Sequence, residues 1–336
     1  MLRIDLLLES GLWLPRIAGR VFLVSFLSLA SLCCACSAET SSISAPPPAS
    51  QSGSNPESGR ESGLSWDFLR SSLWNDGKAE IAFYDVEIHW RAGAEPFTQK
   101  FTAVALLVKQ SFDPRKLVKA SASDPVRVES FQWSFIYDLR SNKRSAAVIA
   151  VQNDLRPLRQ TYTEISWEGS CLRELALPLG GKARRFFHCQ TQSEPDAAIS
   201  FDPKAFTPVE IPLLIRSLDF SANKRHHFKV TLFDGSSVTA TAELVGKEPV
   251  QIHGEALPAE KIKLQLSGAV PYPGGMLSLI ASEETYWRST GANRQILQIE
   301  SKKEDQFDYR VRLIEEIRAD YWTGKPLQLK YLKELP

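Results

Sequence analysis

Histidines and paired acidic residues are the side chains best suited to acid–base or metal chemistry, but their spacing assembles no site. The histidines are His89, His188, His226, His227 and His253. His226 and His227 open a segment of strand-like alternation, where adjacent side chains point to opposite faces and do not easily share one metal ion. His188 beside Cys189 combines two zinc-ligand types, but a strand histidine beside a structural cysteine is the simpler interpretation. We therefore expect no metal ion and no cofactor.

Two acidic pairs, Glu283-Glu284 and Glu315-Glu316, stand out among the carboxylates. General acid–base catalysis needs two carboxyl groups facing one cavity, which adjacent strand positions do not provide. The chain also lacks the G-x-S-x-G, G-x-x-x-x-G-K-[ST], G-x-G-x-x-G and H-E-x-x-H motifs. The sequence therefore predicts no catalytic residues, and we interpret each acidic pair as a polar strand face or a turn.

Large aromatic side chains are spread over many of the segments that alternate like strands. On a curved sheet such side chains can line an apolar groove for a lipid or another hydrophobic ligand. The alternative interpretation is ordinary packing of the core. The four candidate groove residues are Tyr84, Trp90, Trp133 and Trp287.

Only two cysteines, Cys171 and Cys189, lie outside the N-terminal leader. They stand 18 positions apart, on segments that we interpret as neighbouring strands. In an oxidising compartment a disulfide between them would stabilise the fold by roughly 3 kcal/mol in the chain-entropy model. The alternative is two separate buried thiols. We predict the disulfide.

The first 36 residues have the pattern of a secretory signal peptide. Arg16 and Arg20 precede an apolar run of 16 residues, Val21–Cys36, which is short for a helix that spans a bilayer. The run ends in CCACS (33–37), which resembles the lipobox of bacterial lipoproteins. The resemblance implies a lipid on Cys36 and, through Ser37, transport to the outer membrane. Cleavage near Ala38 and an uncleaved anchor are the alternatives.

A tether follows the leader, and residues 37–63 are dominated by Ser, Pro, Ala and Gly. Such a segment buries too little apolar surface to offset its ordering entropy. We therefore expect a flexible link between a membrane anchor and a folded domain. The resulting location is the cell envelope, either as an outer-membrane lipoprotein facing the periplasm or as a secreted periplasmic protein.

The charge of the chain beyond the leader is balanced. Three of the 40 basic and two of the 39 acidic residues lie in the first 36 positions, which leaves 37 of each sign. Nucleic-acid-binding proteins usually carry a basic face. The balance therefore gives no reason to expect a nucleic-acid partner, and we predict none.

Period-two alternation dominates the chain from Trp66 onward and predicts β-strands. In 79–90 the residues Ala82, Tyr84, Val86, Ile88 and Trp90 share one face. Asp234-Gly235 separates two alternating runs and predicts a β-hairpin, because Gly accepts a positive φ. In 309–321 we expect one face to carry Tyr309, Val311, Leu313, Ile317, Ala319 and Tyr321.

One helix is predicted near 208–218. Thr207-Pro208-Val209-Glu210 has the form of a capping box with Pro at the first helical position. The expected fold is mainly β, a strongly curved antiparallel sheet or open barrel in two halves, about 64–200 and 201–325. The helix would lie at their junction, and 326–336 would form a C-terminal tail.

The later half resembles the family catalogued as domain of unknown function 3108, found in bacterial envelope proteins, over roughly 207–322. The resemblance rests on PLLIRSLDF (212–220), VGKEPV (245–250), GEA (254–256), AEKI (259–262) and the aromatic pair Tyr286-Trp287. Ile252-His253-Gly254 departs from the Pro-Ala-Gly that is usual in the family. The resemblance implies an envelope location and a β fold, and it carries no catalytic residues to transfer.

Three functions are compatible with these features. The favoured one is a non-enzymatic, tethered β domain that binds or carries an apolar or envelope ligand. A hydrolase acting on envelope glycan or lipid is the first alternative, and a structural component of an envelope complex is the second. An apolar groove favours the carrier, converging carboxylates and histidine favour the enzyme, and an exposed apolar patch favours the complex.

The leader generates a test of the membrane anchor. Cells labelled with radioactive palmitate should incorporate the label into the wild-type protein and not into Cys36→Ser, because only the cysteine thiol accepts the lipid. Equal labelling of both proteins, or no labelling of the wild type, would contradict the assignment.

Overall fold

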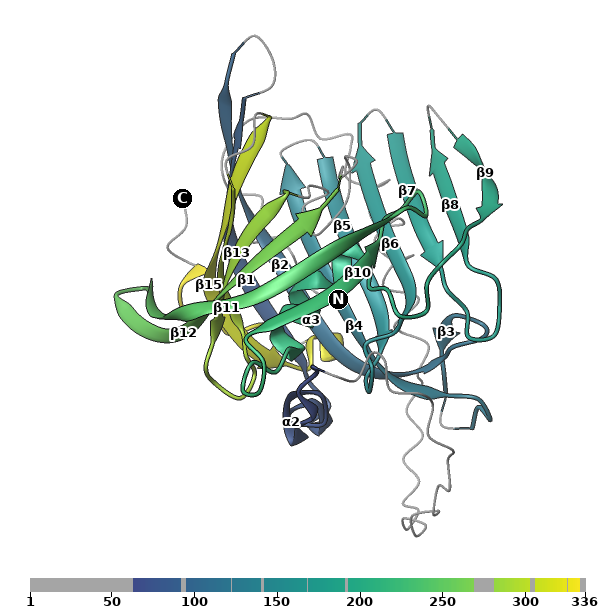
Figure 1. Cartoon of the computed structure of the whole chain (residues 1–336), viewed down its shortest axis with the longest axis horizontal. Coiled ribbons are helices and arrows are strands. Elements are labelled where there is room, and N and C mark those ends of the chain that lie inside the picture. Colours follow the sequence, from purple (N-terminus) through teal and green to yellow (C-terminus); the bar gives the residue numbers. More distant parts are fainter. Residues whose placement is uncertain are drawn as a thin grey trace.

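The computed structural model describes residues 63–332 apart from 92–94, 122, 140–141, 168, 191–192, 269–280, 303–305 and 325, so the leader, Cys36 and most of the tether lie outside it. The described chain forms one antiparallel sheet of fifteen strands (Figure 1). The strands are β1 (Ala79–Trp90), β2 (Phe97–Asp113), β3 (Val118–Lys119), β4 (Val128–Leu139), β5 (Asn142–Val151), β6 (Pro157–Ser166), β7 (Gly169–Ala176), β8 (Arg184–Cys189), β9 (Ser193–Ala198), β10 (Arg225–Thr231), β11 (Ser237–Ile252), β12 (Glu255–Ser267), β13 (Glu283–Ser289), β14 (Ile296–Ser301) and β15 (Phe307–Ala319).

The two halves of the sequence join through the pairing of β1 with β15. The strand order is β10 to β15, then β1, β2 and β4 to β9, with β3 paired beside β2. The edges β9 and β10 do not pair with each other, so the sheet is curved and open, as predicted from the alternation. Figure 1 shows β7, β8 and β9 together at one edge of the curved sheet.

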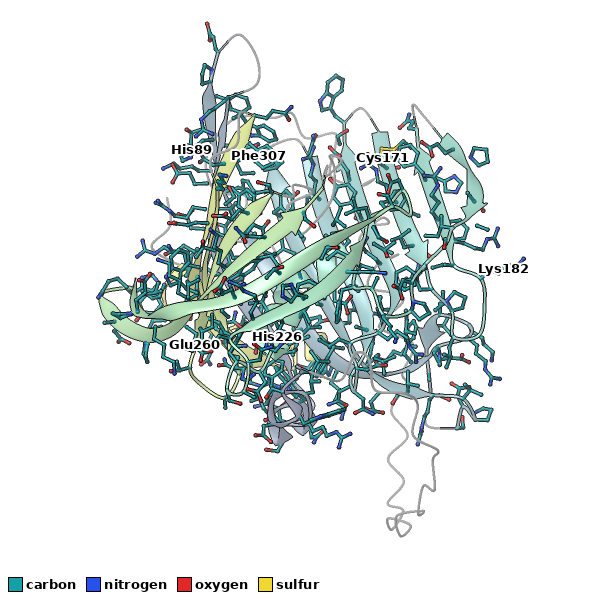
Figure 2. All side chains as sticks on the ribbon, viewed as in Figure 1. His89, Cys171, Lys182, His226, Glu260 and Phe307 are labelled. Carbon is teal, nitrogen blue, oxygen red and sulfur yellow. A yellow bond between two sulfur atoms is a disulfide. The ribbon has the colours of Figure 1, made fainter. Side chains whose placement is uncertain are left out.

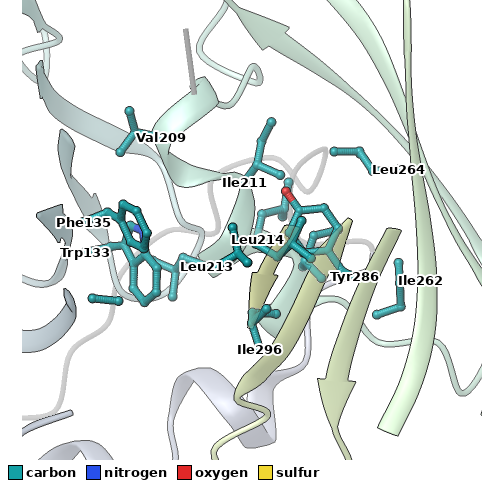
Figure 3. Packing of buried hydrophobic residues seen from close by; sticks show 14 of the residues in the cluster. Trp133, Phe135, Val209, Ile211, Leu213, Leu214, Ile262, Leu264, Tyr286 and Ile296 are labelled. Carbon is teal, nitrogen blue, oxygen red and sulfur yellow. The ribbon is translucent and has the colours of Figure 1, made fainter. Parts of the chain in front are cut away.

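The predicted helix lies inside the curve of the sheet. It begins as a 3-10 turn, Pro208–Glu210, and continues as α3, Ile211–Ser217. The Glu210 carboxylate accepts a hydrogen bond of 3.0 Å from the backbone N–H of Thr207, as in a capping box. Figure 3 shows Leu213 beside Trp133, with Leu214 on the side of Tyr286. The helix therefore packs against both halves of the sheet and fills the space between them.

Two buried arginines fix this helix. Arg216 of α3 forms two hydrogen bonds with the Glu80 carboxylate of β1, at 2.6 and 2.8 Å, and the two side chains are 0% and 2% exposed. Arg288 of β13 donates to the carbonyls of Ile215 and Leu218, both at 2.7 Å. Since the last carbonyls of a helix have no partner within it, Arg288 satisfies groups that burial would otherwise leave unpaired.

The outer face of the sheet carries a second apolar cluster. A β-bulge lies in β15 where Phe83 pairs with Glu315 and Tyr84 pairs with Leu313. The extra residue at the bulge reverses the alternation, so Ile317 packs on the outer cluster. The prediction that all apolar residues of 309–321 share one face is therefore wrong beyond Leu313.

The C-terminal segment covers this outer cluster. The side chains of Leu327, Leu329, Tyr331 and Leu332 pack against it. The Glu315 carboxylate accepts hydrogen bonds from the backbone N–H groups of Lys330, at 2.7 Å, and Tyr331, at 3.0 Å. The tail predicted from 326 onward is thus packed on the sheet as far as Leu332.

The Glu80–Arg216 pair predicts a large effect on stability. Glu80→Gln should lower the free energy of unfolding by about 3–5 kcal/mol, because it leaves the buried Arg216 charge without its counter-charge. Urea unfolding of the two proteins measures the difference. The control is Glu300→Gln, whose partner Arg310 is 57% exposed, and its effect should stay below about 1 kcal/mol. Equal effects of the two substitutions would contradict the assigned role.

Candidate functional site

Three of the four predicted groove residues belong to the packed core. Tyr84 and Trp133 are 2% exposed and Trp287 is 7% exposed, and the Tyr84 hydroxyl donates to the carbonyl of Ile296 at 3.1 Å. Trp90 is half-buried and packs against the main cluster. The structure therefore corrects the groove prediction. The curve of the sheet is filled at Tyr84 and Trp133 by α3 and facing side chains, whereas Trp287 alternates with Tyr286 and lies on the opposite face, against Glu248 and Lys261.

Two carboxylates, the buried Glu80 and the half-buried Glu316, lie where β1 meets β15. Glu316 accepts two hydrogen bonds from the side-chain amide of Asn293, at 2.6 and 2.9 Å, and the Asn293 carbonyl accepts from Arg216 at 2.6 Å. Burial, followed by the negative charge of Glu80, raises the pKa of Glu316 to about 7. Such a carboxyl can exchange a proton at neutral pH, but here its oxygens hold the loop that anchors α3.

Glu284 of β13 is buried. The interpretation of Glu283-Glu284 as a polar strand face or a turn is therefore wrong for Glu284. The hydroxyl groups of Tyr286 and Tyr309 donate to its two carboxylate oxygens. Burial raises the pKa of Glu284. Both oxygens thus accept from tyrosines, Tyr286 on the same strand and Tyr309 on β15, and the bond from Tyr309 joins β13 to β15 across β14.

His89, near the end of β1, contacts two carboxylates. Its Nδ1 lies 2.6 Å from Asp308 and its Nε2 lies 3.2 Å from Glu87. Arg91 also bonds Asp308, and Lys100 bonds Glu87 at 3.0 Å. The basic and acidic groups are therefore paired with one another. Within the described ranges, no group of three or more His, Cys, Asp and Glu side chains could hold a metal ion.

The predicted cysteine pair lies on the concave face. Cys171 of β7 and Cys189 of β8 are directly opposite in the register and form a disulfide in the structure. Figure 2 shows Cys171 near the beginning of β7, close to the edge of the sheet. The disulfide thus covalently joins two of the last strands before the open edge.

An open part of the concave face continues from these cysteines. Phe135, Ala146, Tyr162, Arg173 and Phe187 stand in one row across β4 to β8. Phe135 and Ala146 are fully buried, whereas Tyr162, Arg173 and Phe187 are half-buried. The concave face therefore becomes more exposed from β4 toward β8.

We name the half-buried part of this face the inner patch. The guanidinium of Arg173 lies between two rings, 5.7 Å from the centroid of Tyr162 and 5.1 Å from that of Phe187. Arg144 and Glu164 form an ion pair of 2.7 Å in the next row. Burial lowers the pKa of Arg144, but Tyr162 and Glu164 outweigh it and hold the pKa above its usual range. The inner patch consists of Arg144, Tyr162, Glu164, Arg173 and Phe187.

The next row of the concave face, formed by Gln160 and Leu175, is buried. Gln160 and Leu175 are 6% and 0% exposed, and the Gln160 side chain accepts a hydrogen bond of 3.1 Å from the backbone N–H of Val209. The turn that leads into α3 thus caps this row. The inner patch begins where the helix no longer covers the sheet, and it combines aromatic surface with charged groups.

The sequence analysis did not identify Arg173 or the roles of Glu284 and Glu316. It grouped the acidic residues as adjacent pairs, and it did not assign Arg173 to the alternating face that carries Cys171. Arg173 alternates with Cys171 and Leu175, and Glu284 alternates with Tyr286 and Arg288. Spacing by two residues from a cysteine or an aromatic side chain was therefore the available signal.

Comparisons with known proteins gave remote structural similarities, three of which are described here. No protein-family model matches the chain, and no curated protein matches it. A β-barrel-like protein of domain of unknown function 1849 from Brucella abortus is 10% identical, with a TM-score of 0.43 over 72% of this chain and 98% of that chain. A DUF1329 family protein from Desulfovibrio piger ATCC 29098 is 9% identical, with a TM-score of 0.25 over 74% and 89%. A putative outer membrane lipoprotein-sorting protein domain from Vibrio parahaemolyticus is 9% identical, with a TM-score of 0.21 over 78% and 94%.

At these TM-scores the comparisons assign neither a family nor a function to the chain. The resemblance to domain of unknown function 3108 therefore stays a prediction. Among the described residues, no helix has the length and apolar character needed to cross a membrane.

The position of Glu316 predicts a pH dependence of stability. Its pKa lies at about 7 in the folded protein against 4.5 for an ordinary glutamate. Its stabilising contribution is therefore complete below pH 4.5 and is lost as the pH rises through about 7, a change of about 3 kcal/mol. Urea unfolding from pH 5 to 8 should show this slope in the wild type. Glu316→Gln should flatten it, and an unchanged slope would contradict the assignment.

Proposed function

We propose that this protein binds an apolar ligand on the concave face of its sheet and carries it within the bacterial envelope without altering it chemically. The inner patch is the observation that carries the proposal. The turn that leads into α3 covers the neighbouring concave row of Gln160 and Leu175, and the rings of Tyr162 and Phe187 beside that row stay half-buried. Aromatic surface of this kind contributes ~25 cal/mol for each Å² that a ligand removes from water.

The envelope part of the proposal rests on the leader. Arg16, Arg20 and the apolar run to Cys36 are typical of export, and residues 37–63 would link an anchor to the domain. A tethered domain with a half-open concave face can take up an apolar molecule near one membrane and release it elsewhere. The balanced charge of the chain beyond the leader requires no polyanionic partner.

The proposal favours binding over hydrolysis because of how the acidic groups are used. Glu316 holds Asn293, and Glu284 holds two tyrosines. The inner patch itself contains one carboxylate, Glu164, which is paired with Arg144. A glycoside hydrolase needs two carboxyl groups on either side of one bond, which this patch does not supply.

Two adjacent phenylalanines of β8 provide the test. Phe187 lies on the concave face beside Arg173, whereas Phe186 pairs with Glu174 on the opposite face, and both are half-buried. We expect the mature chain from residue 37 to bind the apolar dye N-phenyl-1-naphthylamine. Phe187→Ala should weaken this binding roughly tenfold, the effect of losing about 1.4 kcal/mol of apolar contact.

Phe186→Ala is the matched control, because it removes the same side chain from the same strand on the outer face. Its dye affinity should equal that of the wild type. Absence of dye binding by the wild type, or an equal loss in both variants, would contradict a ligand site on the concave face.

A further inference from the structure

We infer that the ligand of the inner patch is a lipid with an anionic head group, and that Arg173 binds the head group. This inference rests on the proposed function and adds to it the chemical class of the ligand. It follows from the position of one cation on a face that otherwise pairs its charges.

The other arginines of these strands have carboxylate partners. Arg144 pairs with Glu164 at 2.7 Å, Arg159 with Glu174 at 2.6 Å and Arg185 with Glu194 at 3.1 Å. Each partner lies on the adjacent strand and on the same face of the sheet. Each of these three arginines thus has a glutamate partner on the neighbouring strand.

Arg173 departs from this pattern. Its register partners are Tyr162 on one side and Phe187 on the other. Within the part of the chain that the structure describes, its guanidinium contacts those two rings but forms no ion pair, and its Nε is buried without a hydrogen-bond partner. The inner patch, with Arg144 and Glu164 paired, therefore carries one positive charge that the neighbouring side chains do not neutralise.

A lipid with an anionic head group fits a position that combines a positive charge with aromatic surface. A guanidinium is planar, remains charged and presents paired N–H donors that match a carboxylate or a phosphate. The flanking rings of Tyr162 and Phe187 supply apolar surface for the adjoining chain and attract the cation by cation–π contact. A purely apolar molecule would cover the Arg173 charge without replacing the water it loses, which is unfavourable.

The head group has two chemical sources, the carboxylate of a fatty acid and the phosphate of a phospholipid. Both present oxygen anions to Arg173, and the structure supports the shared chemistry. Three twelve-carbon probes separate the cases: dodecanoate, dodecyl phosphate and the neutral dodecan-1-ol, each measured by titration calorimetry below its aggregation concentration.

The wild-type mature chain should bind at least one of the two anions roughly tenfold more tightly than the alcohol, as expected when one charge-assisted hydrogen-bonded pair is added. Arg173→Gln should remove this preference and leave the affinity for dodecan-1-ol unchanged. Arg173→Lys, which keeps the charge, should retain part of the preference. Binding of dodecan-1-ol by each variant also shows that its concave face is folded.

Arg184→Gln is the matched control. Arg184 also stacks on a phenylalanine of β8, Phe186 at 5.3 Å, but it lies on the outer face and is 55% exposed. It should keep the preference of the wild type for the anion.

Two outcomes overturn the inference, and they are distinct. Equal affinity of the wild type for all three probes would refute an anionic ligand while leaving the apolar site intact. A preference for anions that survives Arg173→Gln would refute the role of Arg173. Failure of every probe to bind would instead contradict the proposed function itself.

Discussion

The ion pair between Arg216 and Glu80 is the interaction on which the arrangement of this molecule depends. Arg216 lies on the short helix inside the sheet, and Glu80 lies on β1, where the two halves of the sequence meet. A buried guanidinium is tolerated only with a counter-charge and hydrogen bonds for its remaining donors. Glu80 and the Asn293 carbonyl supply both. The pair therefore specifies where the helix sits more than it adds to net stability.

The position of the helix decides which part of the concave face is core and which part is surface. Arg288 holds the helix end from the later half of the sheet, and Gln160 holds its first turn from the earlier half. Seven residues of α3 fill only part of a curved sheet of fifteen strands. The strands next to the helix are buried on this face, and β6 to β8 keep half-exposed rings. The position of α3 thus produces both the packed core and the half-buried inner patch.

The disulfide complements this arrangement at the edge of the sheet. β8 has only the short, register-shifted β9 beyond it, so backbone pairing constrains it less than a central strand. A bond between Cys171 and Cys189 holds the register of β7 and β8. The same register places Phe187 beside Arg173. The covalent link therefore maintains the pairing of aromatic and cationic side chains from which we infer the ligand.

Alternation along the chain determined much of the fold, because a residue period of two reports directly which face is buried. Alternation predicted an open antiparallel sheet, the Asp-Gly turn predicted the hairpin between β10 and β11, and the capping box predicted a helix near 208–218. The inner side of β1, from Ala82 to Trp90, also agrees with the pattern. These features depend on neighbours in sequence, which local propensity and turn chemistry describe well.

Tertiary structure alone decided the role of each side chain on those faces. Tyr84 and Trp133 became core residues because α3 lies over them, and a bulge in β15 moved Ile317 to the outer face. Glu316 and Glu284 became hydrogen-bond acceptors within the fold because partners 23 and 25 positions away in the chain approach them. Arg173 was left without a carboxylate because the register placed rings on both sides of it. Each outcome depends on which distant strand arrives opposite a residue, and a single sequence does not encode that locally.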